Sequence, residues 1–218
     1  MITLKEIKSP CAIAACELNK CIYVSDKAAK CVWRVDRVGN IEIFILDLGS
    51  TVNLTVISGG SILTIDGNHL KTFSPEGKIL TSVPLPKDVA NPKYATVTPR
   101  GTYFVGYSSL IGMNHICEIS QTGEILRSFC DSEVKLTFGI CMDPHGQLFV
   151  LDYGNSRILL LDSHLKLKRI IMSEIDHDLF GCMYMSYDGD SGNLLISAFA
   201  TVNRRIKIYN ILLNSRKA

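Results

Sequence analysis

The apolar positions of the chain fall into short runs separated by polar turns, and these runs recur in a fixed order. One run in each repeat ends at an equivalent residue: Asp26, Asp66, Tyr107, Asp152 and Ala198. The steps between these residues are 40, 41, 45 and 46 positions. β-Branched and aromatic residues are enriched in the runs and no helical period is visible, so each run predicts a short strand.

A turn residue in register supports the repeat. Six positions before each of these endpoints stand Lys20, Gly60, Gly101, Gly146 and Gly192. Glycine in four of the five copies is typical of a tight turn that precedes the strand.

Each repeat predicts four strands, because apolar runs also lie before and after the aligned one. In the fourth repeat the loop "DYGNSR" leads into "RILLLD" at 157–162, and a further run follows at 167–172. Four-stranded units at this spacing predict an all-β propeller of about five blades, or a partial six-bladed ring. A surplus segment at 3–7 is expected to form an N-terminal strand that closes the ring, with residues 1–218 as a single domain.

Charge and composition narrow the choice of partners and compartment. The chain has 23 basic and 21 acidic side chains, which gives a net charge of +2, so DNA is not an expected partner. No apolar stretch is long enough for a membrane helix, and Lys5, Glu6 and Lys8 stand where a signal peptide would be apolar. These features predict a cytoplasmic protein that does not bind membranes.

The eight cysteines form no Cys-x-x-Cys pair, which argues against a zinc site. Most of them lie in or beside apolar runs: Cys21, Cys31, Cys117, Cys130, Cys141 and Cys182. Free cysteine behaves there as a small buried hydrophobic residue, so these thiols are expected to pack in the core.

The segment "GQLFVLDYGNSRILLLD" at 146–162 resembles the NHL repeat: glycine, apolar strand, Asp152, a loop with Asn155, then basic Arg157 and a second apolar strand. The resemblance implies a propeller like the C-terminal part of tripartite-motif proteins, many of which are ubiquitin ligases. In those proteins the propeller recruits protein or RNA, while a separate RING domain performs ligation. The sequence shows no Cys/His ladder of RING type, so ligase activity within this chain is not expected.

Two groups of side chains are candidates for catalytic or metal chemistry. Asp152, Asn155 and Arg157 recur in other repeats in altered form, so they are interpreted as a turn device. A metal-dependent, lactonase-like propeller hydrolase is the less favoured alternative, since the innermost runs offer only Asn53 as a metal ligand. The sequence therefore predicts a non-catalytic scaffold without metal or cofactor.

The predicted binding surface lies on the loops that precede each innermost strand, where lysines and aromatic residues are interleaved. Its residues are Lys8, Lys93, Tyr94, Lys135, Phe138 and Phe180. Acidic residues are mixed among them, which favours a protein partner, with RNA as the alternative. The alternative surface is the opposite face, expected to carry the "DYGNSR"-type loops.

Overall fold

Strands make up nearly all the regular structure in the computed structural model. It describes residues 5–49, 51–108, 114–131, 134–135, 137–173, 182–188, 191–199 and 204–210. The only helices among them are two three-residue 3-10 turns, η1 (Ser58–Gly60) and η2 (Tyr153–Asn155). The predicted all-β class is confirmed. No helix in the described residues is long and apolar enough to span a lipid bilayer.

Five antiparallel sheets follow one another along the chain, and each keeps its strands in sequence order. The first contains β1 (Pro10–Cys16), β2 (Cys21–Asp26), β3 (Cys31–Asp36) and β4 (Ile41–Ile45). The second contains β5 (Thr51–Val56), β6 (Ile62–Asp66), β7 (His69–Phe73) and β8 (Ile79–Pro84). The third contains β9 (Pro92–Val97), β10 (Tyr103–Ser108), β11 (Asn114–Ile119) and β12 (Ile125–Cys130).

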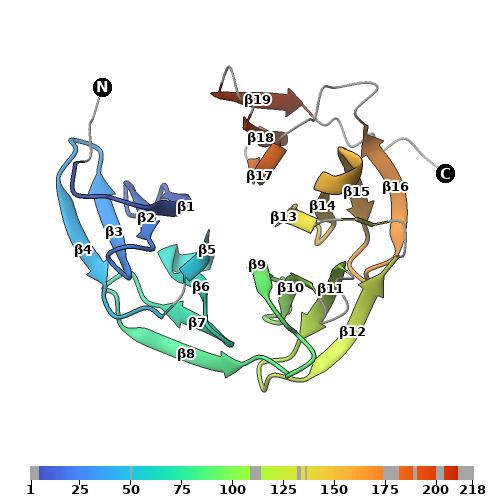
Figure 1. Ribbon diagram of the computed structural model, residues 1–218, viewed down its shortest axis with the longest axis horizontal. Helices are drawn as coiled ribbons and strands as arrows, with labels where there is room; N and C mark the ends of the chain where they lie inside the picture. Colours follow the sequence, from blue (N-terminus) through green and yellow to red (C-terminus); the bar gives the residue numbers. More distant parts are fainter. Residues whose placement is uncertain are drawn as a thin grey trace. The chain divides into compact units, whose positions relative to one another are not determined.

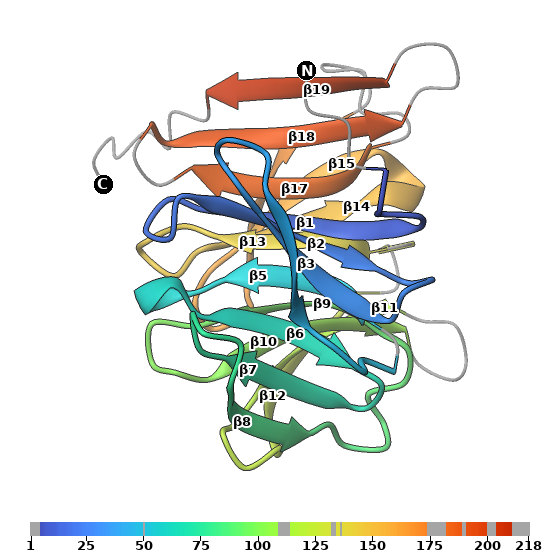
Figure 2. The ribbon, with the colours of Figure 1, turned by 90° about the vertical axis from the view of Figure 1, so that its left-hand side faces the viewer.

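The fourth sheet repeats this pattern and the fifth has three strands among the described residues. The fourth contains β13 (Thr137–Met142), β14 (Leu148–Asp152), β15 (Arg157–Leu161) and β16 (Leu167–Met172). The fifth contains β17 (Cys182–Asp188), β18 (Asn193–Phe199) and β19 (Arg204–Asn210). Four-stranded meanders of this kind are propeller blades, as the repeat predicts. Figure 1 shows the five sheets in chain order, and Figure 2 shows β5 to β8 side by side in one sheet.

The chain divides into two compact units, Met1–Val105 with Glu118–Leu126, and Gly106–Cys117 with Arg127–Ala218. Each unit has a core where neighbouring sheets pack face to face. In the first unit Tyr23 of β2 and Ile62 of β6 are fully buried in one cluster. In the second, Phe149 of β14 packs with Leu194 of β18. The single domain over residues 1–218 stays a prediction.

The turns confirm the register of the repeat. All five residues that the sequence aligns at the first turn have positive φ: Lys20 at 51°, Gly60 at 74°, Gly101 at 79°, Gly146 at 81° and Gly192 at 70°. Glycine adopts this conformation without a steric penalty, which explains its recurrence. Lys20 adopts the same conformation without being glycine.

Part of the predicted ring closure is not observed. Residues 5–7 of the surplus N-terminal segment lie outside any strand, and residues 3 and 4 lie outside the described residues. Within the described residues, the first strand begins at Pro10, where β1 pairs with β2.

The aspartates that end the second strands tie down the segments before the first strands. The Asp26 carboxylate accepts hydrogen bonds from the backbone N–H groups of Lys8 (2.9 Å) and Ser9 (3.1 Å). Asp152 accepts one from the N–H of Lys135 at 3.0 Å. The loops after these aspartates therefore lie at the same end of the sheet as the segments before the first strands. The expectation that they form opposite faces is wrong, because alternate connections of a meander fall at the same end.

Seven cysteines within the described residues are free thiols. Cys16, Cys21, Cys31 and Cys117 are buried, as predicted for packing residues. Cys130 is exposed, so its expected place in the core is wrong. It ends β12, the last strand of its sheet, where the burial pattern is mostly exposed.

Candidate functional site

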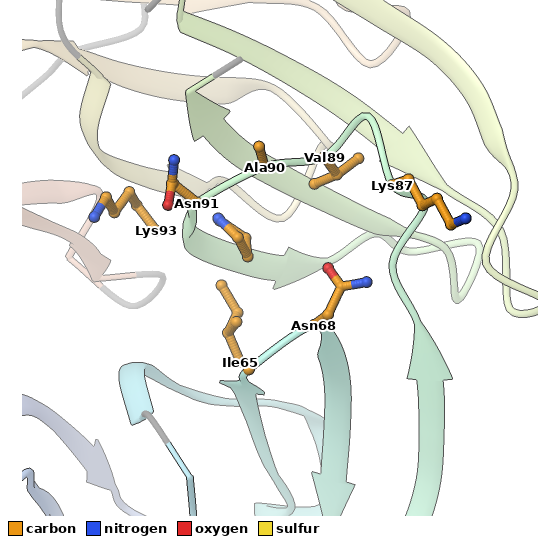
Figure 3. A pocket seen from close by; sticks show the side chains of 9 residues that line it. Ile65, Asn68, Lys87, Val89, Ala90, Asn91 and Lys93 are labelled. Atoms are coloured by element: carbon orange, nitrogen blue, oxygen red, sulfur yellow. The ribbon is translucent and has the colours of Figure 1, made fainter. Parts of the chain in front are cut away.

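The candidate site is a pocket of about 480 Å³ in the first unit, between the β6–β7 turn and the loop that joins β8 to β9. Its lining residues are Ile65, Gly67, Asn68, Lys87, Val89, Ala90, Asn91, Pro92 and Lys93. In Figure 3, Lys93 and Asn91 lie at one side and Lys87 at the other, with Ala90 and Val89 between them. The pocket therefore has a polar group at each side and apolar side chains between.

Local hydrogen bonds fix both walls of the pocket. The side-chain amide of Asn68 donates a hydrogen bond to the backbone carbonyl of Leu85 at 2.8 Å. The backbone carbonyl of Asn68 accepts one from the Leu85 N–H at 2.8 Å. A turn follows, closed by the Val89 N–H to the Pro86 carbonyl at 2.9 Å. Asn91 then takes a left-handed backbone conformation with φ of 46°, which asparagine tolerates better than most residues. The loop reverses there and delivers Lys93 into β9.

The charge of the pocket is positive. Lys87 and Lys93 are exposed, and in the part of the chain that the structure describes neither forms an ion pair. The described lining contains no carboxylate, and its apolar members Ile65 and Val89 are buried, each 1% exposed. Such a lining suits a small organic molecule that carries an anionic group or develops negative charge during reaction.

Of the six predicted surface residues, Lys93 lines this pocket, and Tyr94 follows it in β9. Lys8 is exposed in the same unit, and Lys135 is exposed in the second unit. The backbone of Phe138 lies in β13, but its side chain is outside the described residues, as is all of Phe180. Their role as one binding surface stays a prediction.

A second hollow, about 540 Å³, lies between the first and second sheets of the same unit and is already occupied by internal contacts. Arg34 pairs with Glu42, lies 5.7 Å from the centroid of the Phe44 ring, and donates to the Pro75 carbonyl at 3.5 Å. Because its cation is committed to these groups, this hollow is a weaker candidate than the lysine pocket.

Asn53, the one metal ligand that the sequence offered on the innermost strands, has a structural role. It is 6% exposed, and its side-chain oxygen Oδ1 accepts a hydrogen bond from the N–H of Ala95 in the next sheet at 3.4 Å. Thr55 beside it donates to the Ala95 carbonyl at 2.8 Å. These bonds link β5 to β9. Elsewhere in the described ranges, no three His, Cys, Asp or Glu side chains are grouped as a metal would require.

The Asp152 cluster is the turn device that the sequence predicts. The buried carboxylate accepts from the Asn155 amide at 2.7 Å and from Arg157 Nε at 2.7 Å. Asp152 is 0% exposed and Arg157 17% exposed at their side chains, so the pair faces the loop it holds and not open solvent. Asp66 pairs with Lys71 at 2.5 Å in the same way in the second sheet.

Sequence reasoning did not single out Asn68 and Asn91 as site residues. The signal was the length and composition of the "PKDVANPKY" segment at 86–94, which has two lysines, two prolines and an asparagine. That Asn68, from a separate turn, faces this segment depends on the pairing of β7 with β8, which sets His69 opposite Pro84 and is not encoded in the local pattern.

Comparison with known proteins shows which fold the chain shares, but it does not assign the chain to a family. No family model matches the chain, and no curated protein matches it. The NHL resemblance is therefore not confirmed. Many solved structures do match in three dimensions.

Three of these structures illustrate the range. A virginiamycin B lyase from Staphylococcus aureus is 18% identical with a TM-score of 0.63, covering 94% of this chain and 71% of that one. A gluconolactonase from Xanthomonas campestris is 13% identical with a TM-score of 0.70, covering 94% and 73%. A structure of a nidogen/laminin complex is 17% identical with a TM-score of 0.64, covering 92% and 79%.

The comparison corrects the prediction that the chain is not an enzyme. The fold is shared with a lyase and a gluconolactonase over nearly the whole chain, so the shortage of metal ligands on the innermost runs was not a sound reason to exclude catalysis. Function in such scaffolds lies in individual loops and side chains, not in the repeated blade.

Proposed function

We propose that the chain is an enzyme of the hydrolase or lyase type that acts on a small cyclic ester, with the lysine pocket as its substrate site. The observation that carries the proposal is the pocket lining, which offers two lysines that make no ion pair within the described residues, two asparagines and an apolar floor. The resemblance to a gluconolactonase and a lyase supports the reaction class.

When water adds to the carbonyl carbon of a lactone, negative charge develops first on the carbonyl oxygen. The ring C–O bond then breaks, the ring oxygen leaves as a hydroxyl with one proton of the water, and the other proton goes to solvent, which leaves the charge on the carboxylate product. An ammonium group that lies beside the reacting carbonyl stabilises that charge as it develops. Lys93 is the residue we assign to this role, because it extends from the start of β9 beside Asn91 (Figure 3). Lys87, at the other side of the pocket, would hold a second polar group of the substrate.

The alternative in which a divalent metal supplies the charge is not supported by the described side chains. Hard cations need several oxygen ligands in one place. Asn53 is engaged with β9, and the described lining of the pocket contains no carboxylate. No step of the proposed reaction is therefore assigned to a metal.

The test is to incubate the protein with a panel of lactones and to measure hydrolysis as the release of acid. We expect turnover of at least one lactone, and a loss of about tenfold or more in kcat/KM for Lys93→Met, since removing one charge-stabilising donor commonly costs more than that. Lys27→Met is the matched control, because Lys27 is an exposed lysine in the β2–β3 turn of the same unit. Absence of turnover on the whole panel, or equal activity of the Lys93 variant, would contradict the proposal.

A second candidate function is recruitment of a protein through the same loops, with RNA as the alternative. The nidogen/laminin structure is the observation that favours it, because there a chain of this fold is part of a protein complex. Capture from extract that resists nuclease and is lost in Lys93→Glu, but not in Lys27→Glu, would support a protein partner. Capture abolished by nuclease and by added salt would indicate RNA.

A further inference from the structure

Three side chains of different chemistry form a row across the third sheet, on the neighbouring strands β10, β11 and β12. The His115 ring stacks on Tyr107, with centroids 5.1 Å apart and 16° between the planes. On its other side, His115 Nε2 lies 4.0 Å from Cys130 Sγ. All three residues belong to the second unit. The stack fixes the orientation of the imidazole, and the ring nitrogen faces the thiol.

The second sheet shows that this row is particular to the third. His69 and Pro84 precede His115 and Cys130 by 46 residues each, and His69 is paired with Pro84 across β7 and β8. The third sheet has a thiol where the second has a proline. It also has Tyr107 at the position of Asp66, whose carboxylate is engaged with Lys71. Relative to the second sheet, the third therefore has two substitutions, Tyr107 for Asp66 and Cys130 for Pro84, which place an aromatic ring and a thiol on either side of a histidine that both sheets have.

Cys130 differs from the other described cysteines in accessibility. Four of those are buried, and Cys11 and Cys141 are half-buried. Burial raises the pKa of the Cys117 thiol to about 12 and also raises the pKa of Cys141, so both stay protonated and unreactive. Cys130 is exposed to solvent and has a proton acceptor beside it.

We propose that Cys130 is a site of covalent modification by low-molecular-weight disulfides, with His115 as the base that takes the thiol proton. The sulfur of Cys130 attacks one sulfur of the disulfide, a new S–S bond forms, and the original S–S bond breaks. The thiol proton passes to His115 Nε2, in the tautomer that carries its own proton on Nδ1, and then to the departing thiolate. The products are a mixed disulfide at Cys130 and one free small thiol, so the step needs no other oxidant.

The test uses the full chain incubated with glutathione disulfide, with the modified peptide identified by mass spectrometry and the rate followed by intact mass. We expect one modification, at Cys130, and none in Cys130→Ser. In His115→Phe, which keeps an aromatic ring against Tyr107, we expect the rate to fall about tenfold, since a positioned general base contributes at least that much. His69→Phe, which changes the equivalent histidine of the second sheet, should leave the rate unchanged.

Chemical rescue separates the role as a base from a role in packing. In His115→Ala, free imidazole added to the buffer should restore part of the lost rate, and it should have no effect on the wild type. Matching circular dichroism spectra for all variants show that each is folded. Modification of Cys11 or Cys141 at the rate of Cys130, or an unchanged rate in both His115 variants, would overturn the proposal.

Discussion

The hairpin that joins the last two strands of a sheet brings its glycine against the backbone of the preceding sheet. Gly77 lies against Phe44, and Gly123 against Pro84, where an added Cβ would stand 2.4 Å from the Pro84 carbonyl oxygen. Gly123 also has φ of 91°, a conformation that side chains with a Cβ rarely adopt. Two independent constraints therefore require glycine at this one residue.

Gly123→Ala is expected to destabilise the protein by about 3 kcal/mol, from backbone strain together with the collision with Pro84. Gly59→Ala is the control, since Gly59 has φ of 73° but nothing within 4 Å of an added Cβ. Strain alone should cost that variant about 1 kcal/mol. Urea unfolding of the two variants measures the difference. Equal losses would show that the Pro84 contact has no energetic weight.

At the scale of single residues, the sequence predicted the positions of turns but not which side chains contact one another. Glycine in register at Gly60, Gly101, Gly146 and Gly192 identified the positive-φ turns, because such turns select one residue type. Nothing in the local pattern showed that Cys130 would be exposed beside His115. A strand residue at the end of an apolar run has the same composition whether its side chain enters a core or faces solvent.

At the scale of the element, the loops are held by carboxylates. Asp152 is fully buried, and removing it leaves the N–H of Lys135 and the guanidinium of Arg157 without that acceptor. Asp162, in the β15–β16 turn of the same sheet, accepts from the N–H groups of His164 and Lys166 at a half-buried position. The two aspartates differ in burial and in partners, because within the described residues only Asp152 also pairs with a charged side chain.

Asp152→Ala should therefore lower the free energy of unfolding by about 3 kcal/mol, because breaking a buried pair leaves a charge uncompensated. Asp162→Ala should cost about 1 kcal/mol, as expected for partners that water can replace. Thermal or urea unfolding of both variants gives the comparison. A larger loss at Asp162 would mean that burial does not govern the cost.

The pH dependence of stability follows from the same loops. Burial alone would raise the pKa of Asp26, but the backbone N–H groups of Lys8, Ala29, Ser9 and Ala28 together hold it below the ordinary value. A carboxylate whose pKa is lower in the folded state stabilises the folded protein at pH values above its unfolded pKa, which is about 3.9. This contribution is lost as the pH falls through the folded-state pKa.

The difference in unfolding free energy between wild type and Asp26→Asn should consequently be largest above about pH 5 and should shrink below about pH 4. Denaturant unfolding over that range measures it. A difference that stays constant with pH would show that the ionised form of Asp26 is not the one that holds the loop.

Strand positions were predicted well because the residues carry them directly. The run at 167–172 is the full extent of β16, and the run at 157–162 contains all of β15. The end at which each loop lies was wrong for the "DYGNSR" class, although the alternation of a meander determines it. The pocket was not predicted because its two walls come from segments that the sheet brings together.

At the scale of the whole molecule, propeller chains of very different sequence share this fold, and metal content is one property that distinguishes them. We expect purified protein to hold no stoichiometric metal, because the described residues offer no cluster of three ligands. Elemental analysis of the protein, before and after dialysis against chelator, measures this. Zinc or calcium retained at one equivalent would contradict the ligand assignment and the metal-free reaction proposed above.

The strict alternation of turns also has a practical use. The β3–β4 hairpin lies at the end of the first sheet away from the β2–β3 loop, and its tip residue Val38 is 81% exposed. The Asp36 side chain closes this hairpin by accepting hydrogen bonds from the N–H groups of Val38 and Asn40. Because these bonds lie within the hairpin, its tip has no part in holding the loops at the other end of the sheet. A linker or fluorescent label inserted at Val38 would make this tip an attachment point for immobilising the protein on a sensor, with the lysine pocket left open to reagents in flow.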